Sequence, residues 1–236
     1  MALQVSLVGP DGRGIAGERV MFVVKSGGRS LRVASTECGR GCYRADIPTI
    51  GRAVGVRRGG RSLFFSLPHS WPPPPARALV ARAARVWRGL HTLVARERLA
   101  SSSHNSVHTL YRMVAPDGLS YQIAGGGPAA VIIGTRRWDR ASPSKPWQRS
   151  SQQPALRQPA PYWQSVRDAH VVARLAYRGK QARQVTFFDP SFPAWFQIVL
   201  DSATLRTLDL RMVATAHFMH EVYGPFNSRF TLKAPR

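Results

Sequence analysis

Residues 207–223 have the sequence TLDLRMVATAHFMHEVY, and the alternation of side chains along this stretch decides the fold class. Successive side chains of a β-strand point to opposite faces of a sheet, so a period of two indicates a strand with one buried face. The stretch therefore predicts one long strand, Thr207–Tyr223. Its apolar face consists of Leu208, Leu210, Met212, Ala214, Ala216 and Phe218, and its polar positions include Asp209, Arg211, Thr215 and His217.

The same period-two pattern recurs in eight segments between residues 92 and 200. Turn-forming residues such as Pro116-Asp117-Gly118 and Gly125-Gly126-Gly127 separate them, which predicts an antiparallel meander. One long irregular stretch, residues 141–162, is rich in Pro, Ser and Gln and is typical of a lid or a loosely ordered loop. The predicted strands are Thr92–Ala100, Val107–Val114, Leu119–Ile123, Ala129–Ile133, Arg136–Arg140, His170–Tyr177, Ala182–Asp189 and Trp195–Leu200.

Residues 76–89 break this pattern, because their apolar side chains recur with the spacing of an amphipathic helix. Pro75 precedes the first turn and Gly89 follows the last, as at many helix ends. We therefore expect one helix there, with arginines largely on its outer side. Its apolar positions are Leu79, Val80, Ala83, Val86, Trp87 and Leu90.

The four consecutive prolines Pro72–Pro75 mark a stiff linker, because proline continues neither a helix nor a strand ladder. This predicts a small domain over residues 1–67, a linker over 68–75 and a larger domain over 76–236. Before the linker, the phrase Gly9-Pro10-Asp11-Gly12 resembles the opening of immunoglobulin-like modules. The first domain is thus expected to be a small β-sandwich. Its predicted strands are Leu3–Val8, Val20–Val24, Leu31–Ala34, Cys42–Ile47, Ala53–Val56 and Ser62–Leu67.

The two cysteines of the chain, Cys38 and Cys42, flank the glycine-containing tip Gly39-Arg40-Gly41. A three-residue hairpin loop places its flanking residues at the Cα separation that a disulfide needs. Free buried thiols and a metal site are the alternatives, although no further soft ligand stands nearby. The spacing favours a disulfide, and with it an oxidising, extracytoplasmic location.

The chain has 34 Lys and Arg residues against 12 Asp and Glu, a net charge of +22 and a pI near 11.6. These cations are spread along the whole sequence rather than gathered on one element with stacking aromatics, which argues against nucleic acid as a partner. A solvated basic surface is the favoured interpretation, and an anionic partner such as membrane lipid headgroups or, less favoured, nucleic acid remains the alternative. We expect neither a signal peptide nor a transmembrane segment, since no long apolar run occurs.

Four phrases of the second domain resemble a known family. They are LYRMVAPDGLSYQI, VIIGTRRWDR, FFDPSFPAWFQIVLDSATLRTLDLRM and ATAHFMHEVYGPFN. Together they resemble the C-terminal extracytoplasmic region of bacterial copper-resistance or copper-transport membrane proteins of the CopC/CopD type, itself similar to the half-barrel of LolA/LppX-like lipoprotein carriers. The resemblance implies a role in copper handling at the cell envelope, with a membrane-embedded copper transporter as a partner.

With this resemblance, the expected fold class is mainly β (α+β). A small immunoglobulin-like β-sandwich is followed by a curved antiparallel half-barrel sheet that one amphipathic helix covers. Catalysis is not expected, because the sequence contains none of the common catalytic motifs and no two carboxylates fall as a spaced pair on one inferred face.

A curved sheet under one helix leaves space for either ordinary core packing or an apolar ligand such as an acyl chain or lipid. Aromatic side chains are more numerous than one helix needs to cover the sheet. We therefore predict a cavity as the ligand site. Its predicted lining is Leu79, Ala83, Val86, Leu90, Trp138, Phe187, Trp195, Leu210, Met212, Ala214, Ala216 and Phe218.

Copper is a further candidate ligand. His217 and Met219 are two residues apart on the predicted strand, so they share a face, whereas His220 lies on the other. Imidazole and thioether ligands suit Cu(I). His104 and His108 would complete the site only if their hairpin folded alongside.

These observations favour a non-catalytic extracytoplasmic module that binds or senses a ligand in connection with copper resistance or transport. Two alternatives remain open: a lipid or lipoprotein carrier, and a structural adaptor that docks on anionic membrane lipids.

Overall fold

The structure is a computed structural model that describes residues 2–9, 13–48, 53–66, 72–101, 105–214 and 217–235. The chain divides into two compact units. Unit 1 consists of Met1–Pro74 and Val171–Ala173, and unit 2 of Pro75–His170 and Arg174–Arg236. The main boundary falls inside the proline-rich stretch, residues 68–75, that the sequence marks as a linker.

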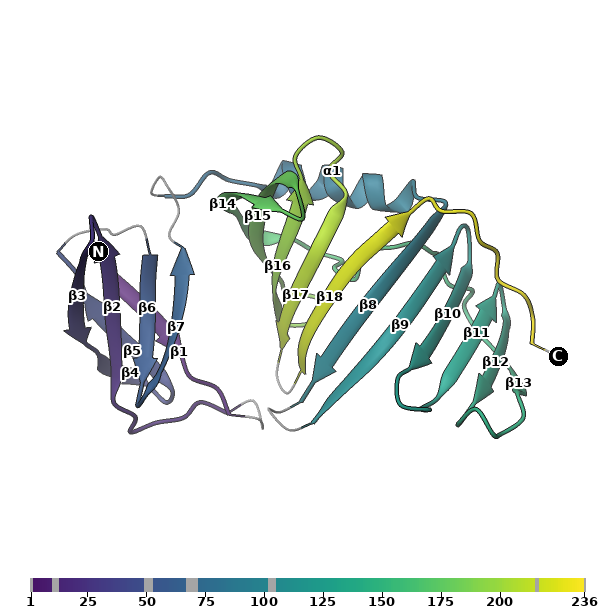
Figure 1. The fold of residues 1–236 in the computed structure, drawn as a ribbon, viewed down its shortest axis with the longest axis horizontal. Helices are drawn as coiled ribbons and strands as arrows, with labels where there is room; N and C mark the ends of the chain where they lie inside the picture. The colour runs from purple at the N-terminus through teal and green to yellow at the C-terminus, as the bar shows by residue number, and fades with distance from the viewer. Residues whose placement is uncertain are drawn as a thin grey trace. The chain divides into compact units, whose positions relative to one another are not determined.

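Unit 1 is a β-sandwich of a three-stranded and a four-stranded sheet (Figure 1). The strand orders are β1-β5-β4 and β3-β2-β6-β7. Apolar residues from both sheets form its core, including Phe22 and Val54 from the larger sheet and Ala45 from the smaller. The strands are β1 (Ala2–Ser6), β2 (Val20–Ser26), β3 (Arg29–Ala34), β4 (Thr36–Gly39), β5 (Cys42–Asp46), β6 (Ala53–Arg58) and β7 (Arg61–Ser66).

The predicted disulfide between Cys38 and Cys42 is present at the β4–β5 turn, with a Cα–Cα distance of 5.1 Å. Gly41 in this turn has a φ of 78°. A Cβ atom there would lie 2.5 Å from the Cα atom of Gly14, so both the backbone angle and the close approach require glycine. Residues 10–12, which include part of the immunoglobulin-like phrase, lie outside the described residues.

Unit 2 is built on one eleven-stranded sheet with the order β13-β12-β11-β10-β9-β8-β18-β17-β16-β15-β14. The sheet is curved but does not close on itself, since β13 and β14 are its two edges (Figure 1). The strands are β8 (Thr92–Ala100), β9 (Ser106–Val114), β10 (Gly118–Ile123), β11 (Ala129–Ile133), β12 (Arg136–Arg140), β13 (Gln148–Ser151), β14 (Arg167–Tyr177), β15 (Lys180–Asp189), β16 (Ala194–Asp201), β17 (Thr207–Ala214) and β18 (His217–Phe226).

One helix, α1 (Arg77–Arg88), lies behind the strands in Figure 1 and covers one face of this sheet. Its buried side chains are Val80, Ala83, Ala84 and Trp87. Three of them belong to the predicted stripe, Ala84 does not, and Leu79 and Val86 of that stripe are half-buried. The last turn carries Arg85 and Arg88, whose charges complement the negative end of the helix dipole. Among the described residues, no helix combines the length and apolar character needed to cross a membrane.

The expected fold class is confirmed: a small sandwich precedes a large curved antiparallel sheet that one helix covers. The predicted single strand Thr207–Tyr223 is wrong, however. The chain there forms two strands, β17 and β18, which pair antiparallel to each other with Met212 opposite Met219. Because the chain reverses direction between Ala214 and His217, Phe218 pairs with Val213 and does not continue the even-numbered stripe.

Two strands have no counterpart in the sequence analysis. β4 is a four-residue exposed strand, and β13 lies inside the stretch 141–162 that was predicted as a lid or loose loop. All four residues of β13, Gln148–Ser151, are polar and exposed, so no buried face marks it as a strand. The position follows only from its pairing with β12, for example Trp138 with Arg149.

Candidate functional site

The face of the sheet toward α1, called the inner face here, has an apolar and aromatic floor. Phe187 on β15 and Phe196 on β16 are opposite each other, and their rings stack with centroids 5.1 Å apart. Val185, Ile198 and Leu210 on the same face are completely buried. These side chains form part of the core of unit 2.

Trp87 on α1 and Trp163 cover this floor. The Trp87 ring meets the rings of Trp163 and Tyr223 edge to face, at 5.5 and 4.8 Å. Trp163 in turn contacts Phe187 at 5.3 Å. The part of the inner face below α1 is therefore filled by protein side chains.

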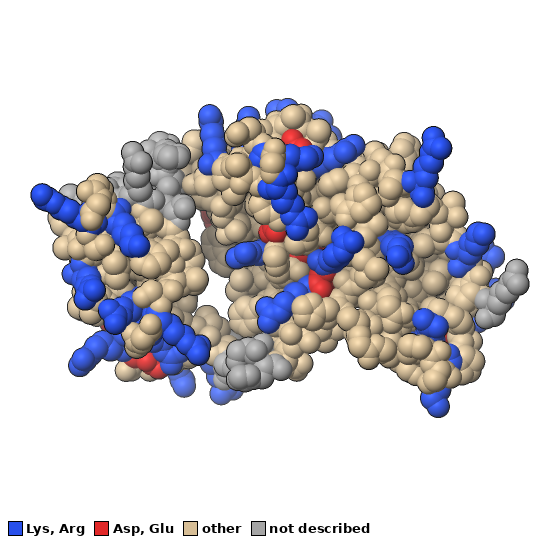
Figure 2. All heavy atoms as spheres, in the orientation of Figure 1, with Lys and Arg blue, Asp and Glu red and all other residues tan. Residues whose placement is uncertain are grey.

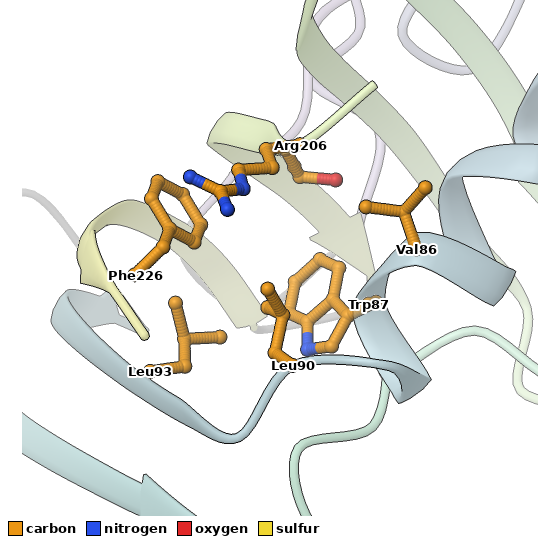
Figure 3. A pocket seen from close by; sticks show the side chains of 7 residues that line it. Val86, Trp87, Leu90, Leu93, Arg206 and Phe226 are labelled. Atoms are coloured by element: carbon orange, nitrogen blue, oxygen red, sulfur yellow. The ribbon is translucent and has the colours of Figure 1, made fainter. Parts of the chain in front are cut away.

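A small hollow remains where α1 ends, and Figure 3 shows the side chains that line it. It contains no volume that a water-sized sphere could enter. The guanidinium of Arg206 lies 5.3 Å from the centre of the Phe226 ring and helps to close it. The residues around it are Val86, Trp87, Leu90, Leu93, Arg206, Thr207 and Phe226.

Farther from the helix the inner face is not completely covered. Register across β8, β9 and β10 places a row of apolar and tyrosine side chains on this face. All of them retain exposure to solvent, up to 37% for Val107. We call this set the open inner face; it consists of Leu99, Val107, Tyr111, Tyr121 and Ile123.

A pair of buried glutamates borders the open inner face. Glu97 on β8 and Glu221 on β18 are direct cross-strand partners, and their exposed fractions are 8% and 0%. The hydroxyl of Tyr111 donates to Glu97 Oε1 at 3.2 Å, and that of Tyr162 donates to Glu221 Oε1 at 2.9 Å. The Tyr223 hydroxyl donates to the other oxygen of Glu221.

Burial raises the pKa of Glu221 to about 7, although the hydrogen bonds from Tyr223 and Tyr162 favour its ionised form. Burial also raises the pKa of Glu97, against the hydrogen bond from Tyr111. Two carboxylates side by side in a poorly solvated site cannot both ionise without cost. The pair therefore retains a proton near neutral pH more readily than exposed carboxyl groups do.

The segment that follows β13 crosses the inner face. Its Gln158 amide donates to the Pro116 carbonyl in the β9–β10 turn at 2.9 Å, and its Tyr162 reaches Glu221. Beyond Trp163, the amides of Gln164 and Ser165 both donate to Asp189 Oδ2. The segment is thus anchored at several points along its path over the sheet.

A second hollow, of about 610 Å³, lies beside the first turns of α1 and is open to solvent. Arg77 and Arg167 contribute its charged side chains, and Asp189 holds its wall through the Gln164 and Ser165 amides. It differs from the predicted apolar cavity in being largely polar.

The residues predicted to line an apolar cavity fall into two groups. On the inner side, Ala83 and Leu90 are buried, Leu79 and Val86 are half-buried, and Phe187, Leu210, Met212 and Ala214 lie on the inner face. Three residues lie on the opposite, outer face of the sheet, because strand alternation places them opposite the inner-face positions. These three are Trp138, Trp195 and Phe218, and Ala216 is outside the described residues.

The histidines and the methionine considered as copper ligands differ in burial and in the face on which they lie. His217 is exposed and Met219 is buried, although both lie on the inner face of β18. His220 and His108 are on the outer face, where the Nε2 atom of His220 is 2.8 Å from Asp209 Oδ2. His104 lies outside the described residues, and within the described part no three side chains of His, Cys, Asp or Glu gather as a metal site requires.

The expectation that no two carboxylates share a face is wrong, because Glu97 and Glu221 do. A signal for Glu97 was present in the sequence, whereas the pattern of residues 207–223 places Glu221 on the polar face. In the alternating series Leu93, Ala95, Glu97, Leu99, a carboxylate occupies a position that the pattern assigns to the buried face. The two glutamates meet because β8 pairs with β18, and local sequence does not encode this pairing.

No protein-family model and no curated protein matches the chain. Solved structures of similar fold include LprF from Mycobacterium bovis, which shares 10% identity and a TM-score of 0.44 over 69% of this chain and 99% of its own. A LolA superfamily protein from Nitrosomonas europaea has 9% identity and a TM-score of 0.33, over 67% of this chain and 95% of that one. A putative outer membrane lipoprotein-sorting protein domain from Vibrio parahaemolyticus has 12% identity and a TM-score of 0.33, over 65% and 93%.

Proposed function

We propose that unit 2 is a non-catalytic carrier that holds an acyl chain or lipid against its inner face. The single observation that carries the proposal is the open inner face. Apolar residues such as Leu99, Val107 and Ile123 share one face of the sheet and retain exposure to solvent. Covering such a surface with an apolar ligand would gain about 25 cal/mol for each Å² removed from water.

The chemistry at the border of this surface suits a lipid as well. A lipid has one polar end, and the Glu97–Glu221 pair with its tyrosine hydroxyls offers both hydrogen-bond donors and acceptors there. An uncharged ester, amide or hydroxyl group would be favoured over a carboxylate, because a second negative charge next to this pair is unfavourable. We therefore expect the site to favour a lipid whose acyl chain is attached to an uncharged polar group.

The disulfide in unit 1 supports an oxidising compartment, such as the cell envelope, as the place of action. We propose the carrier function and not copper binding, because exposed apolar residues on the inner face support a carrier, whereas the copper role rests on the family resemblance alone.

The experiment fills the open inner face and compares the effect with an equal change on the other side of the sheet. Leu99→Trp adds bulk to the inner face, and Leu110→Trp adds the same bulk to the outer face of the neighbouring strand β9. Binding of a fluorescent fatty-acid ester would be titrated for both variants and for the unmodified chain.

We expect the unmodified chain and Leu110→Trp to bind the probe with similar affinity, and Leu99→Trp to bind it at least tenfold more weakly. Circular dichroism checks that both variants fold. The proposal would be contradicted if the unmodified chain did not bind the probe, or if both variants lost the same affinity for it.

A further inference from the structure

The outer face of the sheet carries an exposed apolar row at one end of four neighbouring strands. Register places Phe188 opposite Trp195, Trp195 opposite Val213, and Val213 opposite Phe218. Trp195 and Val213 are 53% and 49% exposed, and the rings of Phe188 and Trp195 are 5.2 Å apart. Side chains of this kind, side by side on a sheet surface, typically mark a contact surface.

The next row of the same face is basic on β17, β18 and β8, whereas on β15 and β16 it consists of Thr186 and Gln197. Two residues farther along each strand, register aligns Arg211 of β17 with His220 of β18, and His220 with Arg98 of β8. Arg98 and Arg211 are exposed. We call the apolar row and this basic row together the outer strip; it consists of Phe188, Trp195, Val213, Phe218, Arg211, His220 and Arg98.

Negative charge near the outer strip is already engaged. Asp209 occupies the following row, and its Oδ2 atom accepts from the Tyr177 hydroxyl at 2.7 Å and contacts His220. Figure 2 shows this side of the molecule, with α1 behind the sheet, and lysines and arginines greatly outnumber acidic residues on it. The outer strip therefore offers a partner two adjacent bands, one apolar and one positively charged.

We propose that the outer strip docks on the surface of an anionic lipid bilayer. The apolar row would enter the interfacial region, where tryptophan is favoured, while the arginines of the next row remain at the level of the phosphate groups. A bilayer interface is layered in this order, apolar and then anionic, and a strip of two parallel bands matches both layers at once.

The same arrangement fits nucleic acid poorly. Single-stranded nucleic acids are bound where aromatic rings and cations alternate along a backbone path, so that bases stack while phosphates pair. In the outer strip the two kinds of side chain are separated into different rows. A bilayer is therefore the partner that the geometry favours.

The first test removes the apolar row. The full chain and its Trp195→Ser/Val213→Ser variant would be sedimented with vesicles of phosphatidylcholine containing 30% phosphatidylglycerol, and with pure phosphatidylcholine vesicles. The matched control, Leu63→Ser/Phe65→Ser, removes two exposed apolar side chains from β7 in unit 1. We expect binding to the anionic vesicles alone, weakened at least tenfold by the outer-strip variant and unchanged by the control.

The second test removes the charge. Arg98→Gln/Arg211→Gln and the control Arg85→Gln/Arg88→Gln lose the same net charge, but the control arginines are exposed on α1. Each basic residue near an anionic surface contributes roughly a factor of five in affinity, so the outer-strip pair should weaken vesicle binding about thirtyfold. The helix pair should change it by much less.

The inference would be overturned if the unmodified chain did not bind anionic vesicles. It would also be overturned if both arginine double variants lost the same affinity for these vesicles, because binding would then follow net charge alone. Strip-dependent binding to a single-stranded oligonucleotide without vesicle binding would overturn it in favour of nucleic acid. Uptake of the fatty-acid ester probe, measured without vesicles, should be unchanged in all four variants. The docking inference and the carrier proposal can therefore fail separately.

Discussion

Glu221 has an environment that is unusual for a glutamate. It is completely buried, it is opposite another glutamate, and two tyrosine hydroxyls donate to its oxygens. A buried carboxyl group of this kind remains acceptable because protonation removes its charge and its hydrogen bonds satisfy its oxygens. Its energetic contribution must therefore depend on pH.

Between pH 4.5 and about 7 the folded chain holds a proton on Glu221 that the unfolded chain has released. Unfolding then releases a proton, so a rise in pH favours the unfolded state. We predict that the free energy of unfolding falls by about 3 kcal/mol across this interval because of Glu221. Urea titrations at several pH values would measure the slope.

Glu221→Gln keeps the shape of the side chain and removes the titration, so it should flatten most of this slope. Asp201→Asn is the control: hydrogen bonds from Lys180, Ala203 and Thr204 outweigh burial and lower the pKa of Asp201 to about 2. Asp201 therefore stabilises the fold above its unfolded pKa, and this contribution is lost only as the pH falls toward 2. An unchanged slope in Glu221→Gln would contradict the assignment.

At the scale of elements, α1 is held to the sheet chiefly through Trp87. This side chain is 3% exposed and meets two other aromatic rings, while the buried Nε1 atom has no hydrogen-bond partner among the described residues. At Trp87 the attachment of α1 is thus a matter of packing, whereas at the start of the helix the Ala76 amide donates to the Ala169 carbonyl at 2.7 Å.

We predict that Trp87→Ala lowers the free energy of unfolding by about 3–5 kcal/mol, because it leaves a cavity in the aromatic layer. Trp87→Phe should cost much less, since the ring contact is partly kept and no hydrogen bond is lost. Arg85→Ala, on the exposed side of the same helix, should stay within about 0.5 kcal/mol of the unmodified chain. Denaturant unfolding followed by tryptophan fluorescence and circular dichroism measures all three, and equal losses for Ala and Phe would show that packing does not hold the helix.

Periodicity alone was sufficient for most elements of unit 2. The strands Thr92–Ala100, Ala129–Ile133 and Arg136–Arg140 were predicted with the bounds that the structure has, because each has a turn signal at its ends. The reversal between β17 and β18 was missed for the opposite reason. The sequence that joins them contains no Gly, Pro, Asn or Asp, and the apolar alternation continues through it.

At the scale of the whole molecule, the sandwich and the large sheet each have a core of their own. Phe22 is 1% exposed in the core of unit 1, and Leu210 is completely buried in unit 2. Separate cores allow two units to unfold in separate steps.

Phe22→Ala should therefore destabilise unit 1 by about 3–5 kcal/mol and leave unit 2 unaffected. Hydrogen exchange measured by mass spectrometry would report both at once, through the amides of β2 in unit 1 and β16 in unit 2. We expect faster exchange in β2 alone, and Leu210→Ala should produce the reverse pattern. Simultaneous loss of protection in both strands would show that the chain unfolds as one cooperative body.

The sequence by itself determined the class of fold, the single helix, the disulfide and most strand positions, because each depends on the identity and spacing of neighbouring residues. The tertiary structure decided which face each strand presents. It placed Trp138, Trp195 and Phe218 on the outer face, and it made Glu97 and Glu221 partners. The physical reason is that alternation along a strand separates its side chains into two faces but does not determine which face the helix covers. That is decided by the pairing of strands far apart in sequence.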